Sequence, residues 1–223
     1  MIWVKICGIA NLDDAAAAIE AGADAIGFVF APSPRRISPR DAARVIGVVP
    51  DKVEKIGVFV NQQYDIILKT VAEAGLTGVQ LHGEEDGQFI EELRNESKLP
   101  IRVVKSITVR EGFESGFSEF EDHGRPDVFL LDSGGAAARG GTGKRFDWRS
   151  SAPLVRLAAR RHHIIIAGGL TPDNVAEAVK QFRPYGVDVA SGVELEPGKK
   201  DHDKVRQFIS ATRKADSDLI RAV

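Results

Sequence analysis

Eight strand-like apolar runs recur along this chain of 223 residues, and they constrain its fold more than any other feature. Most runs are rich in Val, Ile and Phe and nearly continuous in apolar character, which is typical of parallel strands covered by helices. The intervals between them leave room for a loop, a crossover helix and a second loop. The predicted strands are Ile2–Ile6, Ala25–Phe30, Lys55–Val60, Gly78–Leu81, Ile101–Lys105, Asp127–Leu131, His163–Ala167 and Val187–Ala190.

Helix signals occupy the intervals between these runs. Ser38-Pro39 and Thr171-Pro172 each place a cap residue before a proline at the first helical position. The interval between Lys105 and Asp127 is weaker, because glycines at positions 112, 116 and 124 predict a short or broken helix. An open doubly wound sheet is the alternative, but no G-x-G-x-x-G sequence follows the first strand.

We therefore expect an α/β fold, a single-domain (β/α)8 TIM barrel that spans residues 1–214. The mixed polarity of residues 215–223 predicts a frayed C-terminal tail.

Charge and cysteine content exclude several classes of protein. The 30 basic and 32 acidic residues give a net charge of −2, so we expect no nucleic-acid partner and no membrane partner. The apolar runs are shorter than the roughly 20 residues that span a bilayer. Cys7 is the single cysteine, which rules out an internal disulfide and fits a reducing, cytoplasmic location.

Two glycine-bearing turns follow the last two predicted strands. Gly168 and Gly169 come after the seventh run, and Ser191 and Gly192 come after the eighth. In a (β/α)8 barrel these two loops, with the N-terminus of a short extra helix, commonly form a phosphate site. Glycine lets the backbone approach an oxyanion, and free helix N–H groups donate to it. Either turn alone is more often only a tight turn, but the pair in this order predicts a phosphorylated small-molecule substrate.

The catalytic groups of a barrel lie at the C-terminal ends of its strands, where this chain has Cys7 and Asp132. Lys5 shares a face with Cys7 by strand alternation, and its charge is expected to favour the thiolate and make Cys7 a base. Asp132, facing the thiolate across the barrel mouth, is a candidate general acid. By position alone, Cys7 is equally well a small buried hydrophobe, and Asp132 is often merely a turn residue.

Other polar residues also stand at strand ends. Arg35 and Arg36 follow the second run, where a planar guanidinium suits a carboxylate, although at least one of them is expected to be simply solvated. His82 shares a face with Gln80 and is a candidate ligand-facing residue, while a lone histidine is more often structural. No His, Cys and carboxylate cluster shows metal-ligand spacing, so we predict no metal.

Short motifs of one characteristic order are spread from residue 5 to about residue 208. They are Lys5-Ile6-Cys7-Gly8, Gly22-Ala23-Asp24, Gly27-Phe28-Val29-Phe30, Ser33-Pro34-Arg35, Gly57-Val58-Phe59-Val60-Asn61, Val79-Gln80-Leu81-His82-Gly83, Leu130-Leu131-Asp132, Gly140-Gly141-Thr142-Gly143, Phe146-Asp147-Trp148, Ala167-Gly168-Gly169-Leu170, Asn174-Val175 and Asp188-Val189-Ala190-Ser191-Gly192-Val193-Glu194. In this order the motifs closely resemble the phosphoribosylanthranilate isomerase family. The resemblance implies the third step of tryptophan biosynthesis. This step is an Amadori rearrangement of phosphoribosylanthranilate to 1-(o-carboxyphenylamino)-1-deoxyribulose 5-phosphate, without a cofactor.

The resemblance also implies roles for single residues. Asp132 is then the general acid that protonates the ribose ring oxygen, and Cys7 is the general base that removes the C2′ proton. Arg35 directly follows Ser-Pro and is preferred over Arg36 for the anthranilate carboxylate. The remaining substrate-binding residues are His82, Gly141 and Asp188, and the phosphate-binding residues are Gly143, Gly168, Gly169, Ser191 and Gly192.

A glycine-rich segment from Gly134 to Gly143 follows Asp132 directly. A connection of this length and composition in a compact domain is usually functional or mobile. We expect it to be a lid that is mobile without ligand and closes over Asp132 when substrate binds. The sequence fits a monomer or a homodimer.

Two further classes of function remain as alternatives. Indole-glycerol-phosphate synthase and the isomerase of the equivalent histidine-pathway intermediate are related phosphosugar barrels. The synthase needs a catalytic lysine and glutamates at early strand ends, and of these this chain has only Lys5 nearby. The histidine-pathway enzyme is expected to use an aspartate where this chain has Cys7. Both features count against these two enzymes. A non-catalytic barrel that binds a phosphorylated metabolite fits the glycine turns equally well, but it leaves the Lys5 and Cys7 pair without a purpose.

Overall fold

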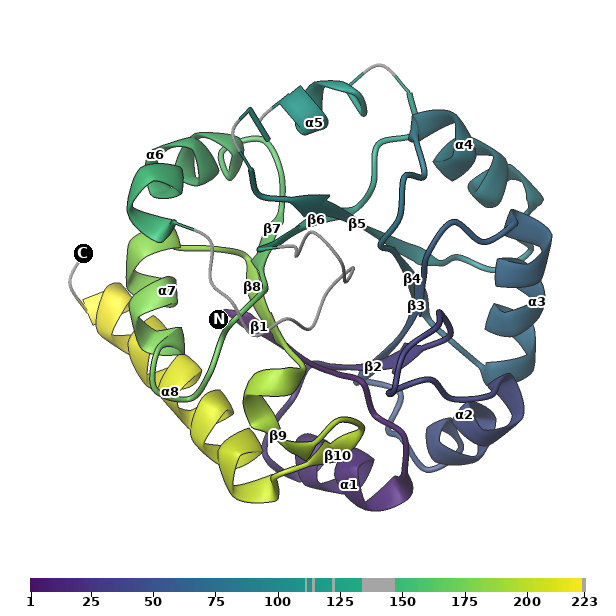
Figure 1. Cartoon of the computed structure of the whole chain (residues 1–223), viewed down its shortest axis with the longest axis horizontal. Coiled ribbons are helices and arrows are strands. Elements are labelled where there is room, and N and C mark those ends of the chain that lie inside the picture. Colours follow the sequence, from purple (N-terminus) through teal and green to yellow (C-terminus); the bar gives the residue numbers. More distant parts are fainter. Residues whose placement is uncertain (111, 114, 122, 134–146, 222–223) are drawn as a thin grey trace.

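Eight parallel strands close into a barrel, and helices surround it (Figure 1). The computed structural model describes residues 1–110, 112–113, 115–121, 123–133 and 147–221. Neighbouring strands pair in chain order, and the eighth pairs with the first, which confirms the predicted TIM barrel. The strands are β1 (Trp3–Cys7), β2 (Ala25–Val29), β3 (Glu54–Phe59), β4 (Gly78–Leu81), β5 (Arg102–Thr108), β6 (Val128–Asp132), β7 (Ile164–Ile166) and β8 (Gly186–Val189).

Helices cover the outside of the barrel, and local side-chain caps fix where several of them begin. Asn11 accepts a hydrogen bond from the backbone N–H of Asp14, and Ser38 accepts one from Asp41, so each satisfies a free N–H of the first turn. The helices are α1 (Leu12–Glu20), α2 (Pro39–Ile46), α3 (Tyr64–Ala74), α4 (Gly87–Glu96), α5 (Ser115–Ser118), α6 (Trp148–Ala158), α7 (Val175–Phe182) and α8 (His202–Arg221).

The unit between β5 and β6 has the short helix that its glycines predict. Helix α5 is only four residues long. Aromatic packing holds it against the barrel, because the ring of Phe117 lies edge-on to Phe129 of β6 with centroids 5.0 Å apart. Phe113 and Phe120 are buried beside it. Edge-to-face aromatic pairs of this kind stabilise by about 0.5–1.5 kcal/mol beyond their buried area.

The barrel has two apolar layers. The larger core lies between strands and helices and contains Val4 and Ile6. A smaller cluster, which includes Trp3 of β1 and Leu130 of β6, fills the barrel interior toward the N-terminal ends of the strands. Side chains alternate along a strand, so every second residue faces the interior, and several of those nearest the C-terminal end of the barrel are polar. They include Lys5, Gln80, Asp132 and Asp188, all buried.

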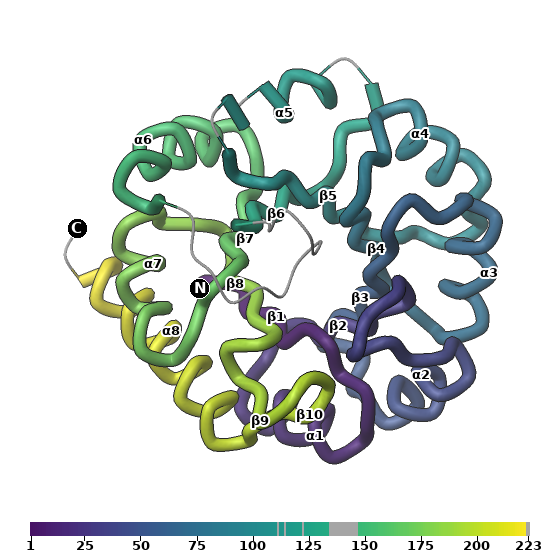
Figure 2. The backbone as a smooth tube through the Cα atoms, in the orientation of Figure 1, coloured from purple at the N-terminus to yellow at the C-terminus, as the bar shows by residue number. Residues whose placement is uncertain are grey.

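The chain after β8 adds the short extra helix that the sequence predicts and a hairpin that it does not predict. A short 3-10 helix, η1 (Ser191–Val193), leads into a hairpin of β9 (Glu194–Glu196) and β10 (Lys199–Lys200). Helix α8 then runs along α1 and α7, back toward the start of the chain (Figure 2).

The prediction of a frayed tail from residue 215 is wrong as far as Arg221, where α8 ends. Arg213 of α8 donates to the carboxylate of Asp24 at 2.7 Å, and Asp216 accepts from the backbone N–H of Ile2 at 2.9 Å. Ala215 is buried. These contacts with the first 24 residues keep the last turns of the helix in place. None of the helices that the structure describes combines the length and apolar character needed to cross a membrane.

Candidate active site

The two glycine turns lie together at the C-terminal end of the barrel. They line a small hollow of about 50 Å³ between β6, β7 and β8. Two carboxylates, Asp132 and Asp188, line the same hollow. The structure thus brings together six residues that the sequence singles out, Asp132, Gly168, Gly169, Asp188, Ser191 and Gly192.

Glycine is required in these turns for the backbone itself. Gly168 and Gly169 have φ angles of 76° and 66°, which L side chains rarely adopt. A Cβ on Gly168 would also lie 2.5 Å from the Asp132 carboxylate. A Cβ on Gly192 would collide with the carbonyl oxygen of Leu170, so the second turn packs directly on the first. The short extra helix expected after β8 is present as η1.

Lys5 crosses the inside of the barrel and binds two strands at once. Its ammonium group donates to Asp188 at 2.8 Å and to Gln80 on β4 at 2.9 Å. The residue is only 1% exposed. Burial alone would lower the pKa of Lys5, but the charges of Asp188 and Cys7 and the hydrogen bonds to them together outweigh it and raise the pKa above its ordinary value. Lys5 is therefore a permanent cation whose charge is largely neutralised by Asp188.

Cys7 is on the same inner face as Lys5, as strand alternation predicts. Both side chains lie against Gly27 of β2, where a Cβ would come within 2.8 Å of the thiol sulfur. Lys5 favours the Cys7 thiolate as predicted, but the expectation that this makes Cys7 a ready thiolate is wrong in the net direction of its pKa. Burial raises the pKa of the Cys7 thiol, and the negative charge of Asp188 raises it further. The positive charge of Lys5 lowers this pKa, but by less than burial and Asp188 together raise it. The net effect on the pKa of Cys7 favours the thiol over the thiolate.

A chain of polar contacts crosses the barrel mouth from Lys5 to Asp132. Gln80 accepts from Lys5 and lies 2.8 Å from the Nδ1 atom of His82 through its own amide nitrogen. The Nε2 atom of His82 lies 3.4 Å from the Asp132 carboxylate, and the Ser133 hydroxyl donates to that carboxylate at 3.3 Å. Since the Gln80 amide donates to Nδ1, the proton of neutral His82 is on Nε2 and points at Asp132.

Arg35 lies beside this network and is held by Glu194. Its Nε and Nη2 atoms donate to the two carboxylate oxygens at 2.8 and 2.6 Å. Lys200 donates to the same carboxylate at 2.8 Å. The hydrogen bonds that Arg35 donates to Glu194 raise the pKa of Arg35, and the two cations together outweigh burial and lower the pKa of Glu194. Gly8, at φ 77°, leaves the space that the Arg35 side chain occupies next to Cys7.

One predicted residue lies away from the others, and two are not described by the structure. Arg36 is exposed and lines a separate hollow beside Phe30 and Phe59, so the structure does not bring it to the other site residues. Gly141 and Gly143 lie outside the described residues, and so does the predicted lid from residue 134 to residue 143.

The sequence did not predict that Glu194, Lys200 or Gln80 would bind and orient other residues of the site. Gln80 was noted only as a neighbour of His82 on one face, and its bond to Lys5 spans 75 residues. Glu194 and Lys200 follow β8, and the one available signal was a charged residue at the end of the Ser-Gly-Val-Glu motif. Among the residues that the structure describes, no group of three or more His, Cys, Asp or Glu is placed to hold a metal ion.

The chain is similar to known proteins over nearly its whole length. Residues 4–211 match the family model described as N-(5'phosphoribosyl)anthranilate (PRA) isomerase. The N-(5'-phosphoribosyl)anthranilate isomerase of Pelobacter propionicus is 46% identical over 222 residues, which cover 99% of this chain and 100% of the relative.

Solved structures agree with this match. One shows monomers generated from the dimeric phosphoribosylanthranilate isomerase of Thermotoga maritima; it is 39% identical, has a TM-score of 0.82, and the match covers 96% of this chain and 100% of that one. Another shows such an isomerase in complex with reduced 1-(o-carboxyphenylamino)-1-deoxyribulose 5-phosphate, at 39% identity, a TM-score of 0.81 and the same coverage.

Proposed function

The chain belongs to the N-(5'-phosphoribosyl)anthranilate isomerase family, and from this membership we propose that it catalyses the isomerisation step of tryptophan biosynthesis. Its substrate is N-(5'-phosphoribosyl)anthranilate, and its product is 1-(o-carboxyphenylamino)-1-deoxyribulose 5-phosphate. The reaction oxidises C2′ of the sugar and reduces C1′ within one molecule, so the enzyme is an intramolecular oxidoreductase of the aldose–ketose type. Proton transfers alone achieve this, and no cofactor is needed.

In this proposal Asp132 and Cys7 divide the proton transfers. Asp132 protonates the furanose ring oxygen, which opens the ring to a Schiff base. Cys7 then removes the C2′ proton to give an enolamine, which tautomerises to the ketone. The Nε2–H of His82 holds the Asp132 carboxyl in position. Because Cys7 rests as a buried thiol, the bound substrate or its Schiff-base cation must favour the thiolate during turnover.

Binding of the two ends of the substrate is assigned to separate groups. The phosphate is held by Gly168, Gly169, Ser191 and Gly192, with Gly143 completing the set. Arg35 binds the anthranilate carboxylate, since it stands next to Cys7 while Arg36 does not. His82, Gly141 and Asp188 contact the sugar. We further propose a cytoplasmic location, and a monomer or a homodimer, as the dimeric relative from Thermotoga maritima illustrates.

The observation that carries the proposal is the shared hollow between two glycine turns, with Asp132 and Asp188 at its edge. The test is the loss of substrate fluorescence when phosphoribosylanthranilate is generated in situ. Cys7→Ala and Asp132→Asn are each expected to reduce turnover by about 10²-fold or more. Asp203→Asn, at an exposed position on α8, is the control and should turn over normally. Wild-type protein that binds the substrate without consuming it would instead identify a non-catalytic barrel.

A further inference from the structure

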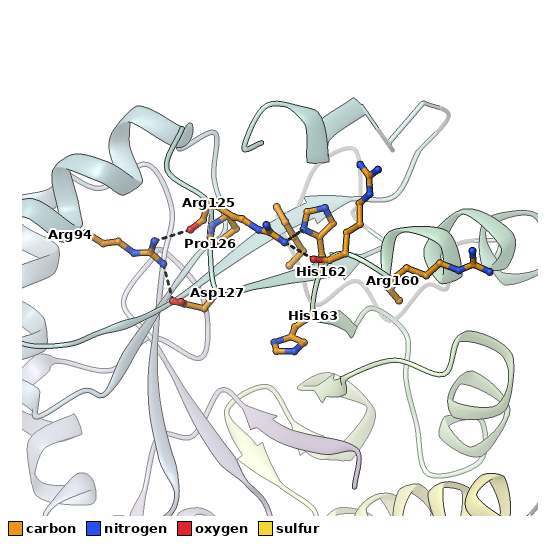
Figure 3. Close-up of a pocket in the computed structure, with 10 residues that line it drawn as sticks. Arg94, Arg125, Pro126, Asp127, Arg160, His162 and His163 are labelled. Carbon is orange, nitrogen blue, oxygen red and sulfur yellow. Dashed lines mark hydrogen bonds and ion pairs between the residues drawn. The ribbon is translucent and has the colours of Figure 1, made fainter. Parts of the chain in front are cut away.

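A second hollow lies at the opposite end of the barrel, where β6 and β7 begin. It has a volume of about 540 Å³ and is larger than the hollow between the glycine turns. Its walls are the end of α4, the segment before β6 and the segment between α6 and β7 (Figure 3). Small-molecule sites commonly have volumes of about 300–1,000 Å³. The proposed isomerase reaction makes no use of this end of the barrel.

Four of the residues that line this second hollow, which we call the basal hollow, are arginines. Arg94, Arg125, Arg160 and Arg161 all border it. Arg94 is paired with Asp127 at 3.0 Å, and Arg161 lies 3.6 Å from Glu121. Within the described part of the chain, no carboxylate pairs with Arg125 or Arg160. The hollow therefore has a surplus of positive charge.

Arg125 is held in place by neutral groups. Its Nη2 atom donates to the carbonyl oxygen of Arg161 and lies 3.2 Å from the Nδ1 atom of His162. The carbonyl oxygen of Arg125 in turn accepts from Arg94 at 2.8 Å. Hydrogen bonds to neutral acceptors position a guanidinium without cancelling its charge, so Arg125 keeps both its place and its positive field.

His162 supplies a fixed donor among these cations. Its ring stacks on Phe117 with centroids 5.5 Å apart and packs edge-on to Phe129 at 5.1 Å. Partial burial and the charges of Arg125 and Arg161 lower the pKa of His162, and Glu121 opposes them. Since Nδ1 accepts from Arg125, the ring proton is on Nε2. Arg160 and Arg161 are exposed at the rim of the hollow.

We propose that the basal hollow is a binding site for a small anion that carries phosphate groups. A planar guanidinium binds two phosphate oxygens at once, and the guanidinium groups of Arg125 and Arg161 both act on the imidazole of His162. An anion would relieve the repulsion between Arg125, Arg160 and Arg161, which the carboxylates present do not fully compensate. The ligand is distinct from the proposed substrate, because the glycine turns and Asp132 lie at the other ends of β6 and β7.

The test uses pyrophosphate as the probe, at constant ionic strength, and isothermal titration calorimetry on the full chain. The site variant is Arg160→Ala with Arg161→Ala, which keeps the backbone carbonyl that accepts from Arg125. The matched control is Arg156→Ala, an exposed arginine on α6 that does not line the hollow. Each protein is titrated with and without saturating reduced 1-(o-carboxyphenylamino)-1-deoxyribulose 5-phosphate, so that binding at the glycine turns is separated from binding at the base.

In the basal hollow, the site variant is expected to bind pyrophosphate at least tenfold more weakly than the wild type does. The Arg156→Ala protein is expected to bind it as tightly as the wild type. The imidazole resonances of His162 should shift on titration in the wild type, even if the reduced analogue does not bind. Equal weakening by Arg156→Ala would mean diffuse surface attraction and would overturn the proposal. Unchanged His162 resonances would also overturn it. Binding of a polyglutamate peptide without binding of pyrophosphate would replace the small anion with an acidic protein partner.

Discussion

The guanidinium group of Arg35 and the carboxylate of Glu194 form a two-pronged ion pair, with bonds of 2.8 and 2.6 Å. The two residues are 159 positions apart in the sequence. Lys200 completes the group from the other side, with a side chain that is fully buried. One carboxylate thus orients the arginine proposed to bind substrate and neutralises a lysine that has no access to water.

Replacing Glu194 by Gln is expected to affect stability and substrate binding together. The change leaves buried Lys200 without its counter-charge, which typically costs about 3–5 kcal/mol, and it frees Arg35 to leave its position. Urea denaturation measures the first effect and the KM for phosphoribosylanthranilate measures the second. Glu196→Gln, at an exposed position on the same strand, should alter neither. A normal KM in a folded Glu194→Gln protein would show that Arg35 does not depend on this pair.

The reactivity of Cys7 tests the direction of its pKa. A raised pKa means a smaller thiolate fraction at neutral pH, so alkylation by iodoacetamide should be slow there. Its rate should increase with pH, with a midpoint above that of the same cysteine in the urea-unfolded chain. Asp188→Asn removes a charge that raises the pKa, so it should move the midpoint to lower pH. Mass spectrometry follows the reaction. Fast alkylation of the native protein at pH 7 would mean that Lys5 prevails after all.

The link between Lys5 and His82 depends on one amide. Gln80→Leu removes both of its hydrogen bonds, and the lost partners of the Lys5 ammonium donor and the His82 Nδ1 acceptor cost about 1–3 kcal/mol. Because His82 then loses its fixed orientation toward Asp132, we expect kcat to decrease more than KM increases. Gln88→Leu, at an exposed position on α4, should change stability by less than about 0.5 kcal/mol. A Gln80→Leu protein of normal kcat would assign the amide to stability alone.

The fold could be predicted because its signals are local. Each strand has an apolar run of its own, and the glycines before β6 shorten α5 within one interval. Two mistaken expectations have a common cause in distant contacts. The polar residues after position 214 look unsupported until Arg213 meets Asp24, 189 positions away. The charge of Lys5 acts on Cys7 as the sequence predicts, but strands from distant parts of the chain bury the thiol, and burial has the larger effect on its pKa.

The second glycine turn separates a backbone requirement from a ligand requirement. The sequence suggested that a side chain on Gly192 would mainly disturb the phosphate. The nearest obstacle in the structure is the Leu170 carbonyl oxygen, so Gly192→Ala should cost about 1–3 kcal/mol in the absence of any ligand. Gly47→Ala, at an ordinary helical φ of −58°, is the control and should be tolerated. Thermal unfolding without phosphate measures both. An unchanged melting temperature for Gly192→Ala would favour the expectation that a side chain there mainly disturbs the phosphate.

The pairing of β1 with β8 has a consequence for how the protein is made. Lys5 and Asp188 are register partners in that pairing, and their side chains also form the ion pair at the centre of the site. A ribosome releases β1 long before it releases β8, so the growing chain carries Lys5 without its partner and an exposed strand edge. The site is assembled in the same step that joins the two ends of the sheet. The appearance of activity during synthesis would therefore report closure of the barrel itself.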